Sequence, residues 1–230
     1  MKVRTLWVAA ALSLAACTHG QNFEKPSLET FNLGVTSRFE VQSKFGNPYR
    51  QSATSRGDDE TSTAPSSPFA AVPVAGSMYF VSYLYHDDTL SLLFNRPVRA
   101  KVINFAFWND VLVGYNFVSG FTADSSNFNE RFVSLLERGK TRKIDVEQMV
   151  GPPTGRVVYP LLRDNGDEEF IYEYVEIAGA IHHERRAKSL YILFDRDGVL
   201  RDYSFSSSNT PLPMEPGPAI VPVPVILPKK

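Results

Sequence analysis

Cys17 is the only cysteine in the chain, and its position predicts a covalent modification rather than a disulfide or a catalytic thiol. It follows a basic start at Lys2 and Arg4, an apolar run over residues 6–14 and two alanines, which is the order of a secretory signal peptide. The apolar run is far shorter than the ~20 residues of a membrane-spanning helix. We therefore expect residues 1–16 to be removed as a signal peptide.

The segment Leu14-Ala15-Ala16-Cys17 resembles the lipobox of bacterial lipoproteins. The resemblance implies a thioether-linked diacylglycerol on Cys17, cleavage before it, and acylation of the new N-terminus by a chain such as palmitate. Each buried methylene contributes about 0.8 kcal/mol, so two or three acyl chains make a stable anchor. Thr18 stands where an Asp implies inner-membrane retention in enteric-type bacteria, so the resemblance points to the periplasmic face of the outer membrane. The alternative is an ordinary secretory signal with a chance cysteine.

No residue pattern in the sequence predicts an enzyme. Gly139-Lys140-Thr141 resembles the end of a phosphate-binding loop, but Ser134 stands where that motif needs a glycine. The chain has no Gly-x-Ser-x-Gly elbow. His182-His183-Glu184 is the only histidine cluster, and adjacent residues on a strand point apart, so we expect a solvated loop rather than a metal site. We predict no catalytic residue, no cofactor and no metal.

The charge distribution predicts no nucleic-acid partner. The formal net charge is -1, and about -3 once the signal peptide is removed, which gives no basic surface for phosphates. The basic run from Arg138 to Lys143 is predicted to be a solvated helix end, with lipid headgroups or an acidic partner as the alternative. The acidic run Asp167-Glu168-Glu169 is predicted to be a surface turn. Trp108 is predicted to lie either in the core or at an interface.

Residues 34–48 and 139–153 form an internal repeat of equal length. Ser37 and Glu40 have the spacing of a capping box at a helix start. In the second copy Thr141 is the expected cap, and the box is lost because Ile144 replaces the acidic partner. A glycine at the predicted C-cap and a proline two residues later end each helix. The matched pairs are Gly34 with Gly139, Thr36 with Thr141, Val41 with Val146, Gly46 with Gly151 and Pro48 with Pro153.

A helix is expected before each repeat, around residues 28–33 and over residues 128–138, so each half opens as a helix-turn-helix. Strands are expected to follow in both halves. Tyr115 and Phe117 alternate onto one face, which predicts a half-buried strand, and Asp197-Gly198 predicts a hairpin turn. The expected strands cover residues 78–85, 90–94, 102–107 and 111–118, then 170–175, 190–194 and 199–205.

The pattern of Gly-x-Thr, apolar helix, Gly-x-Pro and antiparallel strands behind a lipoprotein signal resembles the SmpA/OmlA family of BamE-like outer-membrane lipoproteins. Those proteins have one such unit, whereas this chain has two, as in secreted β-lactamase inhibitor proteins. The resemblance implies an α+β fold, a tandem repeat of helix-turn-helix followed by a three- or four-stranded antiparallel sheet. The expected divisions are an acylated linker over 17–27, a first unit over 28–120 with a long loop over 52–76, a second unit over 121–206, and a disordered proline-rich tail over 207–230.

These observations predict a non-enzymatic lipoprotein held in outer-membrane lipid through acylated Cys17 and binding an envelope protein. By resemblance the partner is the β-barrel assembly machinery or another complex that maintains envelope integrity. The alternative is an inhibitor-like module that binds a periplasmic enzyme. An envelope hydrolase is a third class, and it requires a carboxylate or histidine pair with shifted pKa values in a pocket.

Overall fold

The computed structural model describes residues 18–55, 68–70, 76–87, 99–124, 126–178 and 184–211. Cys17 and the predicted signal peptide lie outside these residues, as do His182 and His183, the strand expected over residues 90–94 and the chain from residue 212. Among the described helices, none has the length and apolar character needed to cross a membrane.

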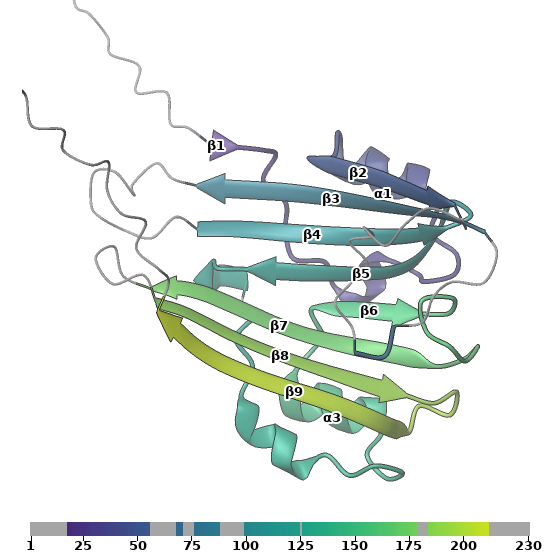
Figure 1. The fold of residues 1–230 in the computed structure, drawn as a ribbon, viewed down its shortest axis with the longest axis vertical. Coiled ribbons are helices and arrows are strands. Elements are labelled where there is room, and N and C mark those ends of the chain that lie inside the picture. The colour runs from purple at the N-terminus through teal and green to yellow at the C-terminus, as the bar shows by residue number, and fades with distance from the viewer. Residues whose placement is uncertain are drawn as a thin grey trace, which may run out of the picture.

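Nine antiparallel strands form one continuous sheet (Figure 1). Its order is β1-β3-β4-β5-β6-β7-β8-β9, and β2 also pairs with β3, so that β1 and β2 share the outer edge of that strand. The strands are β1 (Thr18–His19), β2 (Arg50–Ser55), β3 (Ser77–Asp87), β4 (Arg99–Trp108), β5 (Val111–Ser119), β6 (Gly155–Val158), β7 (Glu168–Ala178), β8 (Glu184–Phe194) and β9 (Leu200–Pro211).

The α-helices of the described residues, α1 (Arg38–Phe45) and α3 (Lys143–Val150), pack on the same face of this sheet. Tyr115 of β5 belongs to the cluster that buries α1, and Phe170 of β7 belongs to the cluster that buries α3. Both residues are paired with Arg156 of β6, and residues directly paired in a sheet share a face. We call this the helix face and the opposite side the open face.

The helix caps agree with the sequence in α1 and differ in α3. Ser37 Oγ accepts from the Glu40 N–H (3.2 Å), and the Ser37 N–H donates to the Glu40 carboxylate (2.6 Å), which confirms the predicted capping box. In α3 the N-cap is Arg142, whose N–H donates to Asp145 Oδ2 (2.8 Å). The cap predicted at Thr141 is wrong, because its hydroxyl accepts from the backbone of Glu137 in the preceding turn instead (2.9 Å).

The predicted fold class, a tandem of helix-turn-helix units each with its own small sheet, is wrong. The described chain is mostly one large antiparallel sheet with few helices. The helices expected before each repeat are short 3₁₀ turns, η1 (Leu28–Thr30) and η3 (Glu130–Leu135). The two halves are joined through β6, which pairs with β5 on one side and β7 on the other. This pairing satisfies backbone groups that two separate sheets would leave on exposed edges.

Equivalent positions of the repeat nevertheless make equivalent contacts. In each half a tyrosine hydroxyl from the sheet donates to the carbonyl of the glycine that ends the helix. In each half a backbone N–H of the last hairpin donates to the carbonyl of the repeated threonine. These contacts are Tyr83 to Gly46 (3.2 Å) and Tyr172 to Gly151 (2.9 Å), then Leu112 to Thr36 (2.8 Å) and Leu200 to Thr141 (2.7 Å).

Two predictions about exposure are also wrong. Strand β5 is buried on both faces over most of its length rather than half-buried, since its residues belong both to the cluster that buries α1 and to the cluster that contains Leu161 and Leu162. The acidic run is not a surface turn, because Asp167 and Glu169 are buried and Glu168 lies between Lys143 and Arg156. The loop expected from residue 52 begins later, since residues 52–55 belong to β2.

The turn between β8 and β9 is as predicted. Asp195 Oδ1 accepts from the backbone N–H groups of Asp197 (3.0 Å) and Val199 (2.9 Å). Gly198 has φ +72°, a conformation that glycine adopts without steric cost. The local turn chemistry therefore places β9 beside β8.

Candidate binding surface

The open face is divided between a covered region and a mixed strip. The segment over residues 159–162 crosses the covered region, where Leu161 and Leu162 are buried against strand residues that include Phe80, Val157 and Ile171. Beyond it the side chains are only half-buried, and the apolar ones belong to none of the buried clusters among the described residues. The mixed strip comprises Ser82, Leu84, Val102, Asn104, Val118, Glu173 and Val175.

Glu173 is the charged centre of the mixed strip. Its Oε2 accepts from Asn116 Nδ2 on β5 (2.7 Å), and its Oε1 accepts from the Tyr191 hydroxyl on β8 (2.5 Å). Asn116 and Tyr191 are buried, whereas Glu173 is half-buried. Hydrogen bonds to a carboxylate are stronger than neutral ones and fix its direction. The strip therefore carries a preoriented carboxylate that is partly open to solvent.

A second polar pair and an apolar row surround this carboxylate. Ser82 Oγ donates to Asn104 Oδ1 between β3 and β4 (2.7 Å). Leu84, Val102 and Val118 lie next to one another in register across β3, β4 and β5. Half-buried apolar side chains and fixed polar groups therefore lie side by side on this part of the open face.

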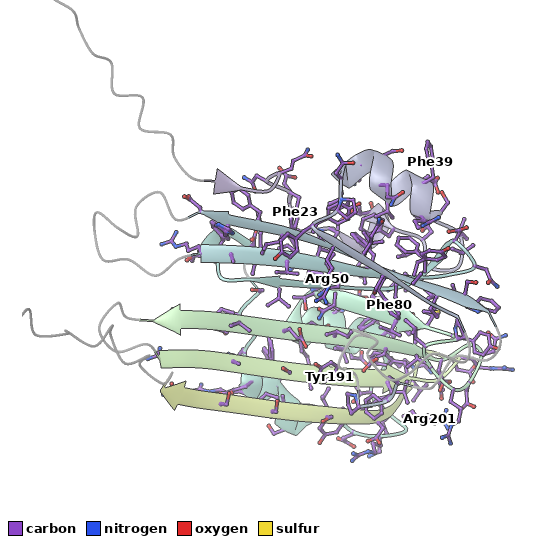
Figure 2. All side chains as sticks on the ribbon, turned by 45° about the horizontal axis from the view of Figure 1, so that its top comes forward. Phe23, Phe39, Arg50, Phe80, Tyr191 and Arg201 are labelled. Carbon is purple, nitrogen blue, oxygen red and sulfur yellow. The ribbon has the colours of Figure 1, made fainter. Side chains whose placement is uncertain are left out.

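The covered region lies beside the mixed strip, and ion pairs hold the connection that follows it. Arg201 of β9 donates from Nη1 to Asp164 and Asp167 (2.6 Å each), and these residues lie on the connection from the crossing segment to β7. Figure 2 shows Tyr191 and Phe80 on the sheet and Arg201 near its edge at β9. Arg201 Nη1 thus links two carboxylates of this connection to β9, and the Asp167 side chain is only 9% exposed.

Glu173 also affects the pKa of its hydrogen-bond donor Tyr191. Burial, followed by the hydrogen bond to Glu173, raises the pKa of Tyr191 well above its ordinary value. A general base or acid needs a pKa near the working pH, so this shift moves Tyr191 away from a catalytic role. Within the described parts of the chain, no group of three or more His, Cys, Asp or Glu residues is arranged to hold a metal ion.

The helix face carries other exposed features. Phe39 on α1 is 78% exposed, and Ile144 at the equivalent position of α3 is 55% exposed; Figure 2 shows Phe39 projecting away from the sheet. A cavity of about 360 Å³ lies between the N-terminal segment and the end of α1, where Lys25 and Lys44 are among the lining residues. Burial, opposed by the charge of Asp124, lowers the pKa of Lys25.

The basic run at residues 138–143 is largely engaged within the molecule. Arg138 pairs with Asp202, Lys140 with Glu137, and Lys143 with Glu168, each at 2.6 Å. Arg138 and Lys140 are more than half exposed, and exposed pairs contribute little to stability. Arg138 and Lys140 are thus exposed as predicted, but they lie in a turn and not at a helix end, and Lys143 is partly buried.

The sequence pointed to Cys17 as its site residue, and Cys17 lies outside the described residues. Sequence reasoning missed Glu173, Asn116 and Tyr191, which come from three strands and meet only through the sheet register. The local signal was weak, because Glu173 stands in a strand with three other glutamates and Tyr191 lies within the apolar run of β8. It does not show which strands become neighbours.

Comparison with known proteins leaves the family open. No family model matches the chain, and no curated protein matches it. Among solved structures it is similar to a Streptococcus mutans crystal structure described as a "putative beta-lactamase inhibitor protein", with 15% sequence identity and a TM-score of 0.37. The match covers 74% of this chain and 82% of that one. A likeness at this level carries no argument about the fold or the function of this chain.

Proposed function

We propose that the chain is a non-enzymatic lipoprotein that binds a folded envelope protein through the mixed strip of its open face. The main support for this binding surface is Glu173. Its half-buried carboxylate accepts hydrogen bonds from Asn116 and Tyr191 and lies among half-buried apolar side chains. A preoriented charge among apolar contacts supplies specificity and area together. A cationic side chain of the partner, placed against Glu173, is the complementary group.

The proposal includes an anchor at Cys17 in the outer membrane, with the folded part in the periplasm. Its support is the lipobox-like sequence before Cys17 and the short apolar run that precedes it. An anchored binding surface meets membrane-associated partners at a raised effective concentration. A modest interface is then sufficient for binding in the cell.

The proposed partner class is the β-barrel assembly machinery or another complex that maintains the envelope. This part rests on the resemblance of the sequence repeat and the lipobox-like segment to the SmpA/OmlA family. The inhibitor-like alternative uses the same strip against a periplasmic enzyme, so the identity of the captured protein separates the two.

Crosslinking and co-purification of the full chain from a Gram-negative host test the proposal. The chain is compared with Val102→Lys and Glu173→Gln on the mixed strip and with Ile144→Lys on the helix face. We expect both strip variants to lose the partner and the helix-face variant to retain it. Glu173→Gln keeps the side-chain shape, so it covers the case in which Val102→Lys fails to fold.

The other results of this experiment test the partner class, the binding surface and the anchor. Recovery of an assembly-machinery component supports the leading partner class, and recovery of a single periplasmic enzyme that the chain inhibits supports the alternative. Retention of the partner by both strip variants contradicts the proposed surface. Unchanged recovery by Cys17→Ala contradicts the need for an anchor.

A further inference from the structure

The segment expected to be a linker after Cys17 is packed on the sheet. Thr18 and His19 form β1 and pair with Asp87 and His86 at the end of β3. Gly20 has φ +86°, and a Cβ atom there would lie 2.0 Å from the Leu84 carbonyl oxygen. The backbone therefore passes directly against β3 at Gly20, and only glycine fits.

Aromatic contacts hold the same segment a few residues later. The ring of Phe23 lies edge-on to Phe45 (5.7 Å between centroids) and to Phe117 (6.3 Å). Lys101 Nζ lies 5.6 Å from the centroid of Phe23 and 5.3 Å from that of Phe121. Lys101 is buried, with 7% of its surface exposed, and cation–π contacts strengthen when the cation is desolvated. Phe23 is thus fixed between the sheet and α1.

The second half of the molecule repeats the contact between a sheet lysine and an aromatic ring, at a place far along the chain from Cys17. Lys188 Nζ lies 5.1 Å from the centroid of Phe128 and donates to the Phe128 carbonyl oxygen (2.8 Å). Phe128 contacts Phe205 in the same edge-on way (6.4 Å). In both halves a lysine of the sheet holds the aromatic residue of the incoming chain segment. Only in the first half does that segment follow Cys17.

Strand β1 lies at one end of the sheet, where β3, β5, β7 and β9 finish and β4 and β8 begin (Figure 1). Cys17 directly precedes Thr18, and consecutive Cα atoms are about 3.8 Å apart. A strand of eleven or twelve residues spans roughly 35–40 Å. Lipid on Cys17 would therefore bring this end of the sheet to the membrane and leave the other end a strand length away.

We infer that this end, formed by β1, the end of β3 and the start of β4, is a membrane-facing surface whose partner is the phospholipid headgroup layer. The strands then point towards the bilayer, and the open face is accessible from the side. The inference rests on the proposed anchor at Cys17. It adds that no flexible tether separates the lipid anchor from the sheet. The ends of the strands then face the headgroup layer.

Contact quenching by lipid-headgroup nitroxides tests this orientation. The full chain is purified from a Gram-negative host and placed in vesicles of phosphatidylethanolamine and phosphatidylglycerol. A fluorophore is attached to Asn209→Cys at the anchor end of β9 or to Asp197→Cys in the turn at the far end. Both positions are exposed, and acylation of Cys17 leaves the introduced cysteine as the only free thiol.

We expect strong quenching at position 209 and none at position 197. A long Gly-Ser insertion between Cys17 and Thr18 should abolish the difference. Equal quenching at both positions would show strands that lie along the bilayer, and quenching at neither would show a folded part held away from it; each result overturns the inference. Failure of the chain to float with vesicles, or labelling of Cys17 itself, overturns the anchor, and this failure is distinguishable from a wrong orientation.

Discussion

At the scale of single residues, the carboxylate of Glu173 depends on two strands at once. Asn116 on β5 and Tyr191 on β8 each donate to one of its oxygens. A buried donor that faces a carboxylate is costly to lose, because the charge then lacks part of its solvation. The position of this charge on the open face is therefore set by the sheet and not by a flexible loop.

Tyr191→Phe removes one of these donors with little change in shape. We expect the free energy of unfolding to fall by about 1–2 kcal/mol, because a hydrogen bond to a charged group is lost. Urea denaturation followed by circular dichroism measures the change. Tyr203→Phe is the control, since the Tyr203 hydroxyl takes part in no described hydrogen bond; an equal loss in both variants would contradict the assigned role.

Ser37→Ala tests the capping box of α1. Loss of an N-cap hydroxyl costs about 1 kcal/mol, and we expect this loss in urea denaturation at neutral pH. Arg142→Ala, at the equivalent position of α3, is the matched control because its cap contact comes from the backbone. An equal change in the free energy of unfolding in the two variants would contradict the capping role of the Ser37 hydroxyl.

The contact between Ser37 and Glu40 also predicts how the free energy of unfolding depends on pH. Hydrogen bonds from the backbone and then the side chain of Ser37 lower the pKa of Glu40 below its ordinary value of 4.5. A carboxylate with a lowered pKa in the folded state stabilises the protein above its ordinary pKa, and this contribution is lost as the pH falls through the folded value. The stability difference between the wild type and Ser37→Ala should therefore narrow below pH 4.5. A difference that widens there would contradict this assignment.

At the scale of elements, Glu168 connects α3 to the centre of the sheet. Its carboxylate accepts from Lys143 Nζ on α3 (2.6 Å) and from Arg156 Nε on β6 (2.5 Å). Its side chain is only 12% exposed, so these pairs are better shielded from solvent than the others around α3. Burial raises the pKa of nearby Tyr115 to about 12, with Arg156 lowering it and Glu168 raising it.

Glu168→Gln should loosen the docking of α3. We expect a loss of about 2 kcal/mol in the free energy of unfolding, because two partly buried cations keep only neutral acceptors. Chemical denaturation gives this value, and hydrogen exchange should show the largest change in α3. Glu137→Gln, which breaks an exposed pair with Lys140, should have no measurable effect. Equal effects would show that burial does not distinguish the two pairs.

Local signals in the sequence predicted some single elements correctly and their assembly poorly. The capping box at Ser37 and the turn at Asp197-Gly198 depend on neighbouring residues, and both are present. The joining of two halves into one sheet depends on β6, a strand of four residues that has no strong local pattern. The mixed strip could not be predicted either, since its register follows from that joining.

At the scale of the whole molecule, the two proposed contact surfaces lie on different sides of the sheet. One end of the sheet carries β1 and is the surface proposed to meet the membrane. The mixed strip lies on the open face, at right angles to that end. In the proposed orientation, a partner reaches the strip from the side without displacing the anchor.

The most direct test of the proposed binding surface is site-specific photocrosslinking in intact cells. A photoreactive phenylalanine analogue replaces Val102 on the mixed strip or Phe39 on the helix face, both in the full chain with Cys17 intact. We expect a discrete crosslinked protein from position 102 and none from position 39. Crosslinking from position 39 alone, or from neither position, would contradict it.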